Sequence, residues 1–146
     1  MRRIITFIRL PFSVQKIYFK ALLLLPICQC SVQLIPFKYL LHIFKLRPSK
    51  RELLKSPTDS ELAYAQTVAW VISKSPPLPQ AIQPRCFAQA LTARILLHQN
   101  HQECLLSIGA AIEGNGLLAH AWLRSGSIIV TGRNGQDNYR EIVSYL

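Results

Sequence analysis

The stretch QPRCFAQAL, residues 83–91, is the most informative part of this chain, because a helix is predicted to begin inside it at Cys86. From Cys86 to about Gln99 apolar residues recur at helical spacing, and Asn100 is a favourable stop signal. Residues 73–85, just before the cysteine, contain four prolines and are predicted to form a stiff, extended loop. The predicted loop therefore ends directly before a cysteine that begins a helix.

A thiol at a helix start has two physical advantages as a nucleophile. The positive end of the helix dipole and the unpaired backbone N–H groups of the first turn both favour the thiolate, which is the reactive form. The same N–H groups can hold the oxyanion that forms when a carbonyl is attacked, and one such donor contributes about 3 kcal/mol in the transition state. Gln80 and Gln83 precede Cys86, and the Gln83 amide is either a second oxyanion donor or a polar loop residue.

A histidine on a predicted strand is the candidate base. Side chains alternate along the segment LLAHAWLR, residues 117–124, so His120 shares a face with Leu118 and Trp122. Trp122 would line the site and shield the imidazole from water. Cysteines at helix starts and histidines on strands are common, so spacing alone leaves open a core thiol and a structural histidine.

The order of the predicted elements indicates an α+β fold, with helices first and an antiparallel meander after them. One helix is expected over residues 12–34, where apolar character nearly all round predicts burial and Pro26 should kink or split the helix. A second should open at Pro36, and a third should follow the capping-box sequence TDSE at residues 58–61. Strands are expected at residues 104–112, 117–124, 128–131 and 139–145.

The positive charge of the chain is concentrated in its front third. The formal net charge is +10, and residues 1–55 hold eleven Lys or Arg and one acid, whereas residues 56–146 hold six of each kind. Such a segment either binds an anionic partner, or its charges only keep an apolar helical region solvated. Nucleic acid is not the expected partner, because the segment is too apolar and lacks a basic helix interleaved with exposed aromatic residues.

A polar, basic connector is predicted over residues 46–56, which include Pro48. We therefore expect a basic, apolar helical region at residues 1–56 and a catalytic core at residues 57–146. The apolar run at residues 17–36 falls short of the roughly 18 uninterrupted apolar residues of a membrane span. A peripheral membrane contact through residues 1–55 stays open.

The four cysteines match no disulfide framework or zinc site. Cys28, Cys30 and Cys104 are therefore predicted to be small core hydrophobes, and reduced thiols favour a cytoplasmic location. No metal and no organic cofactor are expected.

The motifs CFAQAL at residues 86–91, SIG at 107–109 and AHAW at 119–122 resemble the transglutaminase-like cysteine peptidases that process lasso-peptide precursors. The resemblance is specific from about residue 84 to 132 and looser over the front helices, where LIPF at residues 34–37 is similar to the amino-terminal region of that family. It implies a papain-like core, in which a cysteine-bearing helix packs on an antiparallel sheet. It also implies that Cys86 is the nucleophile and His120 the base.

One departure from the family pattern concerns the residue that orients the histidine. The family commonly places an aspartate in the loop after the next strand, whereas this chain reads Val-Thr-Gly at residues 130–132. Either a Cys–His dyad works without such an acceptor, or the acceptor is Thr131, Asn134, Asp137 or a backbone carbonyl, with Asp137 as the candidate third catalytic residue.

The resemblance implies a stand-alone, cytoplasmic leader peptidase in the maturation of a ribosomal peptide antibiotic. It implies three partners, namely the leader peptide of the precursor, a small leader-recognition domain protein and an ATP-dependent macrolactam synthetase. Two alternatives stay open. One is an acyltransferase of the same fold, in which an amine replaces water, and the other is a catalytically weak or inactive binding scaffold, which the missing aspartate favours.

Overall fold

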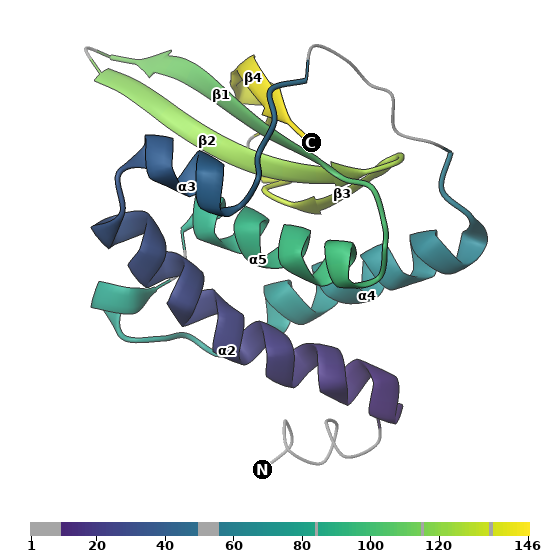
Figure 1. Cartoon of the computed structure of the whole chain (residues 1–146). Helices are drawn as coiled ribbons and strands as arrows, with labels where there is room; N and C mark the ends of the chain where they lie inside the picture. The colour runs from purple at the N-terminus through teal and green to yellow at the C-terminus, as the bar shows by residue number, and fades with distance from the viewer. Residues whose placement is uncertain (1–9, 50–55, 84, 115, 135) are drawn as a thin grey trace.

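The computed structural model describes residues 10–49, 56–83, 85–114, 116–134 and 136–146, and within them helices pack on one antiparallel sheet (Figure 1). This arrangement confirms the α+β fold predicted from the sequence. The helices are α2 (Phe12–Leu34), α3 (Phe37–Ile43), α4 (Asp59–Lys74) and α5 (Cys86–Gln99), with short 3₁₀ segments η1 (Gln80–Ile82) and η2 (Gln136–Asn138). The strands are β1 (Leu105–Glu113), β2 (Gly116–Ser125), β3 (Ile128–Thr131) and β4 (Arg140–Tyr145).

Helix α5 is the central element of the fold. It lies between the sheet and α2, and α4 packs against it as well (Figure 1). The sequence pattern predicts Thr92 on the outer side of this helix, but Thr92 is fully buried and its hydroxyl donates to the Ala88 carbonyl at 2.9 Å. That prediction is wrong because a helix covered on most of its sides has no polar face for the pattern to mark.

Helix α2 runs antiparallel to α5. Lys20 donates to the Gln99 side chain at the end of α5, with Nζ and Oε1 2.8 Å apart, while the Arg85 backbone N–H at the start of α5 donates to Gln29. Of the kink or split predicted at Pro26, the split is wrong, since one helix continues through this residue. A proline removes a single backbone hydrogen bond, and the contact with α5 holds both halves of α2.

Only one side of α2 is buried, although its composition predicts burial nearly all round. The inner side contributes Ile17, Ala21, Leu25 and Cys28 to the core. The outer side leaves five large apolar side chains exposed, namely Phe12, Phe19, Leu23, Ile27 and Leu34.

The sheet has the strand order β3-β2-β1-β4, so the predicted meander is wrong in its last step. Strands β1 and β2 form a long hairpin, and β3 follows β2 as expected. Strand β4 then pairs with β1 at the opposite edge instead of with β3. The crossing begins at Gly132, whose φ of +78° turns the chain in a direction that residues with a side chain rarely adopt.

The segments around the predicted connector are partly described. Pro48 forms an isolated bridge with Tyr145 of β4. The chain after α3 therefore docks on the last strand before it reaches residues 50–55, which lie outside the described part of the structure. Helix α2 enters the same hydrophobic core as the sheet and the other helices.

The capping box predicted before α4 is present. The Glu61 backbone N–H donates to Thr58 Oγ1 at 3.4 Å, and the Thr58 backbone N–H donates to Glu61 Oε2 at 2.7 Å. The structure thus confirms this helix start, which satisfies two backbone donors at once.

Replacing Thr58 by alanine should lower the free energy of unfolding by about 1 kcal/mol, because the cap acceptor is lost while the side chain is exposed and packs little. Urea unfolding followed by circular dichroism measures the change. Thr58→Ser, which keeps the hydroxyl, should stay within a few tenths of a kcal/mol of the native chain. Equal losses in the two variants would contradict a capping role.

Candidate active site

Cys86 is the first residue of α5, as the sequence predicts. Arg85 occupies the N-cap position, and its side chain makes no capping hydrogen bond. In the described part of the chain the first turn of α5 is therefore without a side-chain cap. Such a helix start presents backbone N–H groups and the positive end of the dipole to whatever binds next to the thiol.

Cys86 and His120 line the same open pocket, which has a volume of about 430 Å³. Both residues are half-buried, so each is sheltered by the fold and still accessible from the pocket. The structure therefore brings the two predicted residues together from α5 and β2. The other lining residues are Ala69, Ile72, Ser73, Gln89, Val130, Thr131, Gly132, Arg133 and Asn134.

The imidazole of His120 is held by a backbone carbonyl. Its Nε2 lies 2.8 Å from the carbonyl oxygen of Gly132. Because a carbonyl oxygen can only accept, Nε2 must carry the hydrogen, and in the neutral ring the lone pair is then on Nδ1. The hydrogen bond thus selects the tautomer in which Nδ1 is the base.

Two aromatic rings fix the plane of the imidazole. The Trp122 ring stacks with it at a centroid distance of 6.1 Å, and the Tyr139 ring lies at 5.0 Å. Trp122 is buried beside the imidazole, and it is not among the residues that line the pocket. Tyr139 lies just before β4 and was not a sequence candidate, since nothing in its neighbourhood marks it as a site residue.

Two glycines make room for this arrangement. A Cβ on Gly109 would lie 2.7 Å from the Trp122 ring, and one on Gly132 would lie 2.5 Å from the Ala121 carbonyl oxygen. Real Cβ atoms do not approach other atoms so closely. The close contact between β1, β2 and the loop after β3 therefore requires glycine at both positions, and it brings the Gly132 carbonyl within reach of His120.

Two other predicted site residues lie elsewhere. Asp137 is on η2, is exposed and does not line the pocket, so its orienting role stays a prediction. Gln83 is exposed and its Oε1 accepts from the Leu78 backbone N–H at 2.8 Å, which ties together the proline-rich loop. The pocket lining does not include Gln83.

Sequence reasoning missed several lining residues. Gln89 is three residues after Cys86, and this helical spacing makes the two side chains neighbours, so the signal was present. Ala69 and Ile72 lie on a face of α4 that its periodicity assigns to the core, yet both also border the pocket. Arg133 and Asn134 come from the loop after β3, where no local pattern indicates which side chains turn inward.

Two side chains of helix α2 form hydrogen bonds with the backbone of the segment before Cys86. Gln29 Oε1 accepts the hydrogen bond from the Arg85 backbone N–H at 3.0 Å, and Gln29 is buried, with an exposed fraction of 2%. One turn later, Gln33 Nε2 donates to the Ala81 carbonyl in η1 at 2.9 Å. These contacts fix the backbone directly before the thiol from a helix that contributes no residue to the pocket lining.

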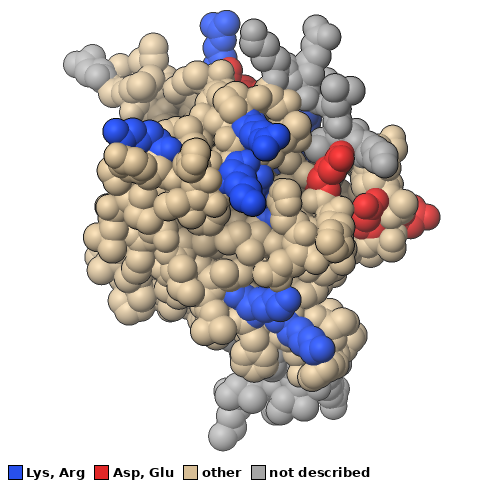
Figure 2. Space-filling model, viewed as in Figure 1, with Lys and Arg blue, Asp and Glu red and all other residues tan. Residues whose placement is uncertain are grey.

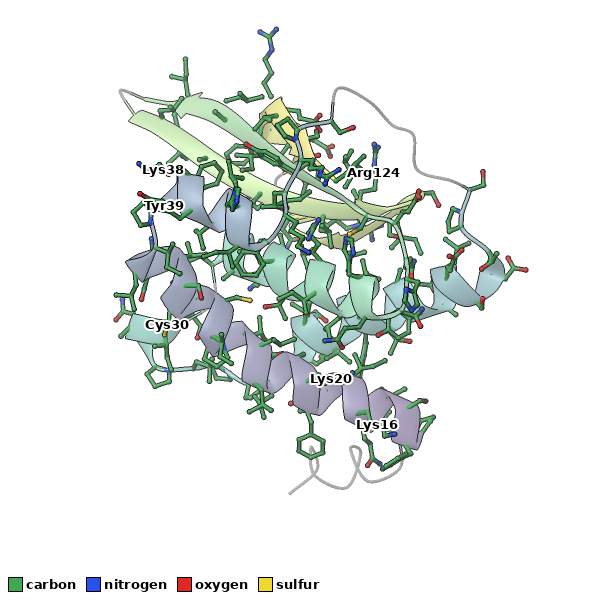
Figure 3. The ribbon with its side chains drawn as sticks, in the orientation of Figure 1. Lys16, Lys20, Cys30, Lys38, Tyr39 and Arg124 are labelled. Carbon is green, nitrogen blue, oxygen red and sulfur yellow. The ribbon has the colours of Figure 1, made fainter. Side chains whose placement is uncertain are left out.

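The remaining cysteines differ from Cys86 in their surroundings. Burial raises the pKa of Cys28, although a hydrogen bond with Thr92 opposes the shift, and burial raises the pKa of Cys104 to about 12. Both thiols therefore stay protonated at neutral pH and are closed to reagents. Cys30 on α2 is half-buried and lies outside the pocket lining (Figure 3).

A helix-start thiol and a strand histidine in one pocket define the Cys–His class of acyl-transfer sites. A family model described as the transglutaminase-like superfamily matches residues 31–144, so the chain belongs to that superfamily. The superfamily includes cysteine peptidases and acyltransferases. No curated protein and no solved structure matches the chain.

In folded protein carrying Cys30→Ser, iodoacetamide should modify one thiol, Cys86, because Cys28 and Cys104 are buried and protonated. Intact-mass and peptide-mass measurements identify the labelled residue. The Cys30→Ser/Cys86→Ala chain should stay unlabelled until it is unfolded in guanidinium. Labelling of Cys104 before Cys86 in the folded chain would contradict this structure of the site.

Proposed function

We propose that this protein is a cysteine peptidase that removes the leader peptide from a ribosomally made lasso-peptide precursor. The observation that supports a peptidase most directly is the pocket that Cys86 and His120 share. Cys86 begins a helix that has no side-chain cap, and the Gly132 carbonyl fixes the tautomer of His120 in which Nδ1 is the base. The choice of a lasso-peptide precursor rests on the resemblance of residues 86–91 and 119–122 to the leader peptidases.

The proposed reaction follows from the two side chains. Nδ1 of His120 takes the proton of the Cys86 thiol, and the thiolate attacks the peptide carbonyl at the leader–core junction. The backbone N–H groups at the start of α5 hold the oxyanion. The imidazolium then protonates the leaving amine, and a thioester remains on Cys86. His120 next removes a proton from water, whose attack on the thioester releases the acyl group and restores the thiol.

An extended peptide fits the edge of the sheet beside His120. Strand β3 pairs with β2 only from Leu123 to Ser125, so in the described part of the chain Gly116–Ala119 have no strand on that side. These four residues are exposed and lie immediately before His120. Unpaired strand edges bind extended peptides through backbone hydrogen bonds, with side-chain pockets adding specificity. A substrate strand on this edge would lead its scissile bond toward the pocket.

The proposed partners follow from the resemblance. They are the leader peptide, a leader-recognition domain protein and a macrolactam synthetase that closes the ring after cleavage. The proposed location is the cytoplasm, where precursor, partners and a reduced thiol would meet.

An acyltransferase is the second candidate, since the superfamily includes that reaction. The same thioester would then be attacked by an amine in place of water. The missing aspartate gives the inactive-scaffold alternative less support, because the Gly132 carbonyl oxygen accepts a hydrogen bond from His120 in place of a carboxylate.

Incubation with the recognition protein and a lasso-peptide precursor tests the proposal. The native chain should release free leader, and Cys86→Ala or His120→Ala should lower the rate by at least about a thousandfold, because each removes a reacting group. Cys30→Ala is the matched control and should keep the native rate, since Cys30 lies outside the pocket lining. Mass spectrometry separates hydrolysis from transfer, because a new isopeptide bond identifies an acyltransferase. Leader release by Cys86→Ala would rule out the thiol mechanism.

Gln29→Met should lower kcat by about tenfold with little change in KM, because the partly buried Arg85 N–H loses its acceptor and the backbone before the thiol is no longer held in place. The unsatisfied donor should also lower the free energy of unfolding by about 1–3 kcal/mol. Cys28→Ala, a buried change at the neighbouring position of α2, provides a stability-matched control that leaves this hydrogen bond intact. Equal kcat values in the two variants would show that Gln29 only stabilises the fold.

A further inference from the structure

The outer side of α2 carries a narrow apolar stripe that the core does not use. The stripe consists of Phe12, Phe19, Leu23, Ile27 and Leu34, and for example Leu23 is 68% exposed and Ile27 58%. Since each helical residue turns the chain by about 100°, these five side chains lie within an arc of about 80°. An exposed apolar surface of this length on a soluble fold marks a contact with a membrane or with another protein.

The two charged side chains of α2 are both lysines. Lys16 falls within the same arc, with its Nζ 4.7 Å from the centre of the Phe12 ring, and Lys20 follows one turn later. Figure 3 labels both lysines on α2, and the same region of Figure 2, which has the same view, shows blue patches and no red atoms. The sequence explains this, because the first acidic residue of the chain is Glu52.

We propose that this stripe docks the protein on an anionic lipid bilayer. Large apolar side chains enter the boundary between headgroups and acyl chains, while lysines on the same helix contact anionic headgroups. Residues 1–55 hold eleven Lys or Arg and one acid, so the segment that contains α2 has a net positive charge that favours an anionic partner. A membrane surface is also long and flat enough to contact the whole stripe at once.

The helix would lie along the membrane surface and not cross it. By length and composition α2 is the one helix in the described residues that could span a bilayer. Its inner side, however, contributes Ile17, Ala21 and Leu25 to the core, and Gln29 holds the backbone before Cys86. A spanning position would remove all these contacts from the fold, whereas a surface position uses only the exposed stripe.

Co-sedimentation of the full chain with lipid vesicles tests the proposal. Vesicles of phosphatidylcholine mixed with phosphatidylglycerol should bind the chain at least about tenfold more tightly than phosphatidylcholine alone, and added salt should weaken this binding. Leu23→Glu/Ile27→Glu should lower binding to the anionic vesicles by about tenfold or more, because both apolar anchors are replaced by like-charged groups. Circular dichroism should show an unchanged fold, since both side chains are exposed.

Ile112→Glu/Ile142→Glu provides the matched control, because these isoleucines are 83% and 68% exposed on β1 and β4 and should not affect vesicle binding. The Cys86→Ala chain should also bind like the native one, so this test does not depend on peptidase activity. Equal binding to both kinds of vesicle, or unchanged binding by the stripe variant, would overturn the proposal. Self-association abolished by the stripe variant, without vesicle binding, would overturn it in favour of a second copy of the chain.

Discussion

The hydrogen bond from the Arg85 backbone N–H to Gln29 is the contact on which the site depends. Arg85 is the N-cap of α5 but does not cap the helix with its own side chain, so the helix start is positioned from outside, by α2. Gln33 holds η1 from the same helix. Misplacement of a nucleophile by about 1 Å can cost a hundredfold in rate, and for that reason a buried amide far from the chemistry matters. The front helix is thus part of the machinery that places the thiol.

The histidine is positioned by a different kind of contact. A carboxylate partner would fix the ring and also stabilise the imidazolium that forms during the reaction. The Gly132 carbonyl fixes the ring and its tautomer, but as a neutral acceptor it stabilises the positive charge less. Trp122 and Tyr139 supply the remaining orientation through ring contacts. The candidate site therefore orients the proposed base through geometry more than it stabilises the charge of that base.

Features encoded within a few neighbouring residues could be predicted from the sequence. The start of α5 at Cys86, its end before Asn100, the capping box at Thr58 and the hairpin that carries His120 all depend on local periodicity or local hydrogen bonds. The pairing of β4 with β1 could not be predicted, because it depends on how the chain turns at Gly132 and not on the pattern of either strand.

The residues of the candidate site also differ in whether the sequence could identify them. Cys86 and His120 carry recognisable motifs, whereas the acceptor that orients the histidine is a backbone atom, which every residue has and no sequence motif identifies. Gln29 has its partner 56 positions away, so its role appears only when α2 and α5 lie side by side. Gln89 could have been found, since its helical spacing from Cys86 places it at the pocket.

The crossing from β3 to β4 has a consequence for the order in which the molecule can assemble. During synthesis the hairpin β1–β2 emerges from the ribosome well before β4, which must return to the far edge beside β1. Tyr139, which contacts the ring of His120, arrives with that last strand. Contacts between distant parts of a chain form late in folding. A nascent chain therefore carries its thiol before Tyr139 lies beside the histidine, and the candidate site is complete only after β4 has paired with β1.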